Sequence, residues 1–180
     1  VVSVTDIGSG NWIAAGPFVV GDPRDREIGS KIDAAMREKD WRPPENKRDA
    51  AAVYDVADGK KSAWVKIDGS SDFIDLGRIF DRYYGTIGYA MTYIHSPVEA
   101  YVRLLYGMDY WMKIWINGEL VKDVEPHGGA PFKGQFQVDV PLKPGANELF
   151  VKIASGSLGN GFWMAVSDTG NLMFSQTEKQ

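Results

Sequence analysis

Aromatic residues and a lysine alternate within one short segment that ends at an Asn-Gly turn. In a regularly pleated strand over residues 111–116, Trp111, Lys113 and Trp115 point to one face, and three apolar side chains point to the other. Indole rings stack on the C–H faces of sugars, whose hydroxyls accept hydrogen bonds from a lysine. The pattern therefore indicates a glycan-binding sheet face. The alternative interpretation is that both tryptophans fill a second packing layer, as large aromatic side chains often do.

A second candidate site lies in the loops that a β-sandwich would gather at one end. Asp109 and Tyr110 immediately precede the aromatic strand. Tyr83 and Tyr84 precede another strand, and His127 lies in a loop beside two glycines, where it could donate to a ligand hydroxyl. Loops on a rigid scaffold commonly carry binding residues. The tyrosine pair can instead be a covering patch over the end of the sandwich.

The sequence offers little for catalysis or metal binding. Cysteine is absent, and the two histidines, His95 and His127, are not at metal-ligand spacing. Residues 155–159 lack the first glycine of a nucleophile elbow. The acidic side chains of residues 22–27 alternate with arginines, which favours a self-neutralised helix start over a cation site. A catalytic pair of carboxylates could still be brought together by folding, because such pairs meet across space. A free-standing enzyme therefore remains an alternative.

Composition sets the class of protein that can carry these residues. The 180 residues suffice for one domain with a hydrophobic core, and 44% of them are hydrophobic. No apolar run is long enough to span a bilayer. The net charge of −4 and the mixing of both signs along the chain show no basic surface for nucleic acid. We expect neither a membrane nor a nucleic acid as partner. Because the chain starts at Val1 without a signal segment, we expect a processed protein or an excised module.

Short alternating segments separated by turn residues predict an antiparallel sandwich or barrel. Polar residues 21–47 predict a long excursion after the first strand, and the spacing of Ile28, Ile32 and Met36 predicts a helix near residues 24–39. The expected strands cover residues 11–20, 62–68, 73–76, 89–95, 100–106, 111–116, 132–142, 147–154 and 162–166.

Two turn motifs are the most specific landmarks of the chain. They are the Trp-x-Asn-Gly hairpin of residues 115–118 and the Leu-Lys-x-Gly-x-Asn turn of residues 142–147. Further landmarks are Trp12, Gly16-Pro17-Phe18, Pro43-Pro44-Glu45, Gly59-Lys60-Lys61 with Trp64, and Tyr89-Ala90 with Tyr93. Together they resemble the jelly-roll, galactose-binding-like β-sandwich modules attached to bacterial polysaccharide-degrading enzymes. The likeness spans nearly the whole chain.

The resemblance implies one all-β, antiparallel jelly-roll domain over residues 1–180. It implies a non-catalytic, secreted carbohydrate-binding module, extracellular or periplasmic, that binds a polysaccharide or oligosaccharide weakly beside a covalently linked catalytic domain. Such modules often bind a structural calcium ion, but no run of ligands for one stands out in this sequence. No other cofactor is expected. Lys113 and Lys152 would favour an acidic or sulfated glycan. The net charge of −4 disfavours a strongly anionic one. The alternative is a structural β-sandwich domain that packs against a catalytic or assembly partner.

Overall fold

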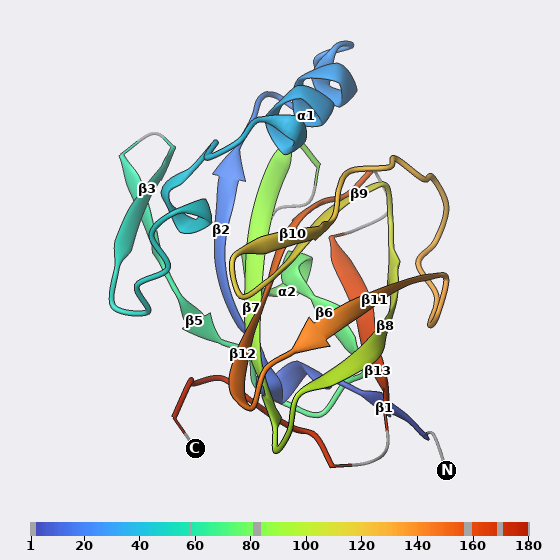
Figure 1. Ribbon diagram of the computed structural model, residues 1–180. Helices are drawn as coiled ribbons and strands as arrows, with labels where there is room; N and C mark the ends of the chain where they lie inside the picture. The colour runs from blue at the N-terminus through green and yellow to red at the C-terminus, as the bar shows by residue number, and fades with distance from the viewer. Residues whose placement is uncertain (1–2, 58, 81–83, 157–159, 169–170, 180) are drawn as a thin grey trace.

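Alternating apolar residues build two antiparallel sheets in the computed structural model, which describes residues 3–57, 59–80, 84–156, 160–168 and 171–179 (Figure 1). The first sheet has the order β1 (Ser3–Asp6), β13 (Gly161–Asp168), β8 (Ala100–Met108) and β11 (Phe136–Leu142), and β6 (Phe73–Asp75) also pairs with β13. The second has the order β10 (Glu119–Lys122), β9 (Trp111–Ile116), β12 (Gly145–Ala154), β7 (Thr86–Ser96), β2 (Ile13–Val19) and β5 (Val65–Lys66), with β14 (Met173–Ser175) on β7. The predicted all-β antiparallel sandwich is confirmed.

The remaining elements decorate the two sheets. They are a separate hairpin of β3 (Val53–Ala57) and β4 (Lys60–Ala63), the helices α1 (Ile28–Arg37) and α2 (Leu76–Phe80), and two 3-10 turns, η1 (Ser9–Asn11) and η2 (Pro43–Glu45). The helix predicted within the polar excursion is confirmed as α1, although β1 precedes the strand that the sequence indicated as the first. No helix in the described part of the chain combines the length and the apolar character needed to cross a membrane.

The main core lies between the sheets and is filled by alternate residues of each strand. Met112, Ile114 and Ile116 of β9 are buried in it, as the alternation predicted. From the facing sheet, β8 contributes Leu104 and Tyr106. This half of the strand prediction is therefore confirmed, because only one register of β9 buries these three side chains together.

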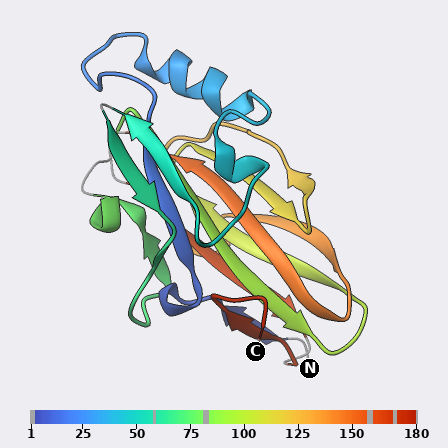
Figure 2. The same ribbon diagram turned by 90° about the vertical axis from the view of Figure 1, so that its left-hand side faces the viewer.

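A second core covers the other face of the larger sheet. In Figures 1 and 2, α1 and the chain that follows it lie across this sheet. Ile32 and Met36 of α1 pack in one cluster with Trp111 of β9 and Phe150 of β12. The expectation of an open sheet face at Trp111, Lys113 and Trp115 is therefore wrong. A helix with an apolar stripe must bury that stripe, and this sheet face is where it does so.

Two lysines of the covered face end at the C-terminus of α1. Lys152 of β12 is fully buried, and its Nζ lies 2.6 Å from Glu45 Oε1 and donates to the carbonyl of Ala35 at 2.8 Å. Lys113 of β9 donates to the carbonyl of Arg37 at 3.4 Å. Because the last carbonyls of a helix lack partners within the helix, these ammonium groups satisfy them and complement the helix dipole. Lys152 is thus a buried structural group and is not accessible to the acidic or sulfated glycan that the sequence suggested for it.

The two turn motifs that carry the family resemblance bond to each other. Asn117 and Gly118 take left-handed backbone angles in the turn between β9 and β10, as an Asn-Gly hairpin requires. Asn117 Nδ2 donates to Oδ1 of Asn147 at 2.8 Å. Asn147 is fully buried, and its own amide donates to the carbonyls of Lys143 and Ile94. The motifs therefore form one hydrogen-bonded unit at this end of the sheet.

Buried tyrosines predict a loss of stability at alkaline pH. Burial raises the pKa of Tyr106 to about 12, and burial together with the Glu45 carboxylate raises the pKa of Tyr89. Above the ordinary tyrosine value of 10.0, the unfolded chain therefore loses protons that the folded chain keeps. Burial lowers the pKa of Lys152 from 10.5. Below pH 10.5 this shift makes the free energy of unfolding rise with pH, opposite to the effect of the tyrosines.

The free energy of unfolding should therefore fall from pH 10.5 to pH 12, by about 1.4 kcal/mol per pH unit for each protected tyrosine. Urea denaturation at a series of pH values measures this slope. Tyr106→Phe should make the slope shallower. A flat profile in the parent protein would contradict the expectation.

Candidate functional site

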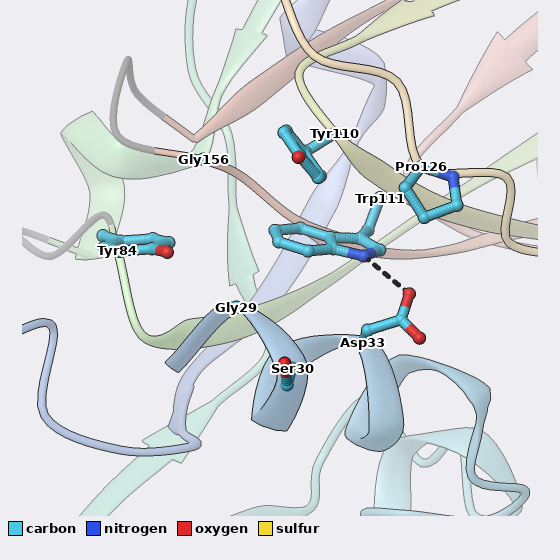
Figure 3. A pocket seen from close by; sticks show the side chains of 8 residues that line it. All are labelled: Gly29, Ser30, Asp33, Tyr84, Tyr110, Trp111, Pro126 and Gly156. Carbon is cyan, nitrogen blue, oxygen red and sulfur yellow. Dashed lines mark hydrogen bonds between the residues drawn. The ribbon is translucent and has the colours of Figure 1, made fainter. Parts of the chain in front are cut away.

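A cavity of about 740 Å³ lies where the N-terminal half of α1 faces the beginning of β9 (Figure 3). Volumes of roughly 300–1,000 Å³ are usual for small-molecule sites. Segments far apart in the chain converge on it: α1, the start of β9, and the connections before β7, before β9, after β10 and after β12. The lining residues are Gly29, Ser30, Asp33, Tyr84, Tyr110, Trp111, Pro126 and Gly156.

Three aromatic rings border this cavity. The rings of Tyr110 and Trp111 are in contact, with centroids 4.2 Å apart and planes tilted by 43°. Tyr84 comes from the chain just before β7 and lies apart from that pair, across the same space (Figure 3). Trp111 is buried, whereas Tyr110 is 37% exposed and Tyr84 is half-buried. The cavity therefore offers both a fixed ring and rings that solvent and a ligand can reach.

The backbone of Tyr110 is held in an unusual conformation. Its φ is +88°, in the left-handed region that non-glycine residues seldom adopt. Two backbone hydrogen bonds with His127 fix it there. The Tyr110 amide donates to the His127 carbonyl at 2.9 Å, and the His127 amide donates to the Tyr110 carbonyl at 3.0 Å. Such strained residues cluster at functional sites, where the surrounding structure enforces them. Here the strained residue places its ring beside Trp111.

The polar face of α1 forms the side of the cavity opposite the rings. Gly29 and Asp33 are four residues apart, and Ser30 lies beside them, so all three project from one side of the helix. At Gly29 a side chain would enter the cavity: a methyl group placed there would lie 3.7 Å from the Tyr84 hydroxyl oxygen. The helix therefore contributes a carboxylate, a hydroxyl and open space.

Asp33 is the ionised group of the site. Trp111 Nε1 donates to its Oδ1 at 3.0 Å, and Arg37 Nε donates to its Oδ2 at 2.7 Å. Hydrogen bonding to Arg37, supported by the Trp111 bond, holds the pKa of this carboxyl below its ordinary value against the effect of burial. A carboxylate can accept about four hydrogen bonds. Asp33 accepts three from protein groups, including Arg37 Nη2 to Oδ1 at 3.3 Å, and its side chain is 33% exposed.

The structure brings together some of the residues that the sequence singled out and separates others. Tyr84, Tyr110 and Trp111, which were assigned to two different surfaces, line the same cavity. Lys113 lies farther along β9 under the end of α1, and Trp115 packs against Phe150 with ring centroids 5.4 Å apart. Neither of these two β9 residues lines the cavity.

The remaining predicted residues have other positions. His127 contributes its backbone to the Tyr110 contact, but its exposed ring packs edge-on against Phe136 at 5.1 Å. Asp109 is buried behind the cavity wall, where a methyl group placed on Gly156 would lie 3.4 Å from its Oδ2. Tyr83 lies outside the described residues.

The described residues show no group of three or more His, Asp or Glu side chains placed to hold a metal ion. Two of the acidic residues of the 22–27 cluster are paired with cations. Asp22 binds Arg24 at 2.8 Å, and Asp25 binds Lys31 at 2.5 Å. These pairs agree with the self-neutralised helix start that the charge pattern favoured.

No protein-family model matches the sequence, and no curated protein matches it at a significant level. The structure is similar to part of a β-glucosidase from Kluyveromyces marxianus solved in complex with glucose, with a TM-score of 0.50 and 14% identity. The chain shares a fold with part of this glycosidase. The match covers 93% of this chain and 18% of the enzyme chain, so this chain spans less than a fifth of the enzyme's length. A putative β-galactosidase from Bacteroides fragilis matches with 18% identity and a TM-score of 0.44, over 93% of this chain and 23% of the other.

Sequence reasoning missed the contribution of α1 to the site. Gly29, Ser30 and Asp33 were assigned to an excursion without a role, although their i, i+1 and i+4 spacing already placed them on one face of the predicted helix. Pro126 and Gly156 carried no signal that could distinguish them from ordinary loop residues. The sequence did not indicate which sheet face the helix covers, so it could not bring α1 next to Trp111.

Proposed function

We propose that this chain is a non-catalytic carbohydrate-binding module, part of a secreted protein, and that the cavity between α1 and β9 is its binding site. The observation that carries the proposal is the gathering of three aromatic rings and an ionised carboxylate around one cavity. Sugar rings stack on aromatic faces, and their hydroxyls donate to carboxylates. The likeness of the fold to part of a β-glucosidase supports a carbohydrate-related role.

The site should bind weakly. A stacked ring that buries on the order of 100 Å² contributes about 2–3 kcal/mol. Two such contacts with a few hydrogen bonds give only millimolar to micromolar affinity after the cost of association. If the chain belongs to a longer protein, a linked catalytic domain or a second module raises the effective affinity for a polysaccharide.

The state of Asp33 supports a binding role over that of a general acid. A general acid works best when its pKa is raised towards the working pH. Arg37 and Trp111 instead lower the pKa of Asp33, so that it stays ionised and accepts hydrogen bonds. Such a group suits the recognition of hydroxyls.

One observation favours the alternative of a structural domain that packs against a catalytic or assembly partner. Trp111 and Lys113, two residues of the predicted platform, are buried and engaged with α1. In that case no glycan should bind, and substitutions of the cavity residues should not change the retention of the protein on any polysaccharide.

Tyr84→Ala should abolish retention of the protein on a polysaccharide affinity gel, because Tyr84 is the reachable ring opposite the Tyr110 and Trp111 pair. The melting temperature should change little, since Tyr84 is only half-buried. The matched control is Tyr101→Ala, which removes a 79% exposed tyrosine from β8 in the other sheet. The control should be retained like the parent. No retention of the parent on any glycan would favour the structural alternative, whereas equal retention of both variants would mean that the glycan binds at another surface.

A further inference from the structure

The cavity has an ionised carboxylate and no cationic side chain among the described residues that line it. Its polar side chains are Asp33, the hydroxyl of Ser30 and the hydroxyls of two tyrosines (Figure 3). All of these can accept hydrogen bonds from a ligand, and the hydroxyls can also donate. A ligand with its own negative charge would find no ion-pair partner within this lining.

Three cations at the C-terminal end of α1 and on the sheet face beneath it are engaged with protein groups. Arg37 uses two nitrogens on Asp33 itself, at 2.7 and 3.3 Å. Lys113 is directed to the carbonyl of Arg37 and lies 3.5 Å from Asp123 Oδ1, with its side chain 8% exposed. Lys152 is fully buried against Glu45. The lysines that the sequence suggested for an acidic glycan therefore belong to the second core.

Asp33 has the geometry of a hydroxyl acceptor. Its two oxygens accept three hydrogen bonds from Trp111 and Arg37, which fix the carboxylate plane and leave one acceptor position. Hydrogen bonds to an ionised acceptor are roughly twice as strong as neutral ones. A ligand carboxylate or sulfate placed here has no proton to give to this acceptor, and it meets a like charge that the Arg37 guanidinium, 2.7 Å away, offsets in part.

We infer that the cavity selects neutral saccharides and excludes uronic acids and sulfated sugars, with Asp33 as the residue that discriminates. This inference rests on the proposed function, since it names the ligand class of the same site. A neutral sugar donates a hydroxyl to the remaining acceptor position of Asp33 while its ring packs on the aromatic wall. An acidic sugar carries an acceptor-only group that Asp33 cannot bond.

The test is a titration of the protein by NMR with oligosaccharides of glucose, galactose and mannose and with the corresponding uronate oligosaccharides. At least one neutral sugar should bind. Its uronate counterpart should bind at least about tenfold more weakly, as expected for a lost charge-assisted hydrogen bond, so the ratio of the two affinities should be about ten or more. Added salt should narrow this ratio, because it screens the repulsion.

Asp33→Asn should also lower the ratio of neutral-sugar affinity to uronate affinity, because it removes the negative charge of the carboxylate at nearly constant side-chain shape. The matched control is Asp139→Asn. Asp139 forms a similar two-bond pair with Arg103, at 2.7 and 3.1 Å, on the outer part of the other sheet, so the substitution makes the same change of net charge away from the cavity. The control should leave the ratio unchanged.

The outcomes separate the two proposals. A uronate that binds as tightly as its neutral counterpart, or a ratio that neither salt nor Asp33→Asn changes, would overturn the inference and leave glycan binding standing. Binding of no sugar from either class would overturn the proposed function and the inference together.

Discussion

Lys152→Met is expected to lower the free energy of unfolding by about 3–5 kcal/mol, the usual cost of removing one partner from a buried ion pair. The substitution leaves the Glu45 carboxylate, whose side chain is 4% exposed, without its cation. It also removes the donor to the Ala35 carbonyl at the end of α1. The Tyr89 hydroxyl, which donates to the same Glu45 oxygen at 2.6 Å, would be the strongest remaining partner of the carboxylate.

Urea denaturation at neutral pH measures this loss, and an exposed pair gives the control. Lys61 binds Asp55 at 2.7 Å, but both side chains are largely exposed, so Lys61→Met should cost less than about 1 kcal/mol. Combining Lys152→Met with Glu45→Leu should recover part of the stability, because it removes the buried unpaired charge, although the buried Tyr89 hydroxyl then loses its acceptor. A loss for Lys152→Met no larger than that for Lys61→Met would contradict the structural role of the buried pair.

The same ion pair connects stability to the candidate site. Lys152 and Lys113 hold the C-terminal end of α1, while Gly29 near its start and Asp33 in its middle line the cavity. The helix thus has one end fixed by strand lysines and the other end beside the cavity. This division explains how a segment outside the two sheets can present side chains at defined positions.

The strands and the helix could be predicted because their signals are local. Alternation over residues 111–116 indicated which three side chains of β9 enter the main core, and that prediction is confirmed. The spacing of Ile28, Ile32 and Met36 likewise indicated α1 within about four residues at each end. Turn residues indicated the β9–β10 hairpin, and Asn117 and Gly118 adopt the expected left-handed angles.

The position of the helix on the sheet could not be predicted, because it depends on contacts between distant segments. Both faces of each sheet alternate in a sandwich, so alternation does not tell which face is solvated. Lys113 and Lys152 indicated a wet face, since lysines are seldom buried. Their partners, the last carbonyls of α1 and Glu45, come from segments more than 70 residues earlier in the chain.

The interpretation of the tryptophans changed for the same reason. Trp111 was expected to be either a ligand platform or a packing residue, and it is buried while one side still borders the cavity. The candidate site therefore combines residues from both surfaces that the sequence proposed, around a helix that the sequence predicted but did not place. Tyr84 and Tyr110, which the sequence assigned to loops, line this cavity, and their role in binding a ligand stays a prediction.

Gly29→Leu is expected to abolish glycan retention without lowering stability, which separates the site from the fold. Gly29 is the second residue of α1. Among the described residues outside the helix, the nearest atom to a methyl group placed there is the Tyr84 hydroxyl oxygen, at an ordinary contact distance of 3.7 Å. A longer side chain therefore extends into the cavity rather than into packed atoms. Replacing glycine in a helix should raise the free energy of unfolding by up to about 0.5–1 kcal/mol.

Affinity gels and urea denaturation on the same protein samples measure the two effects. The matched control is Ala34→Leu, which adds a leucine to an exposed position of the same helix that does not line the cavity. This control should keep full retention, because it leaves the space between Tyr84 and Trp111 open. If Gly29→Leu were retained as strongly as the parent, glycan would bind at another surface of the sandwich. If Gly29→Leu lost stability instead, the space beside Gly29 would be needed for packing rather than for a ligand.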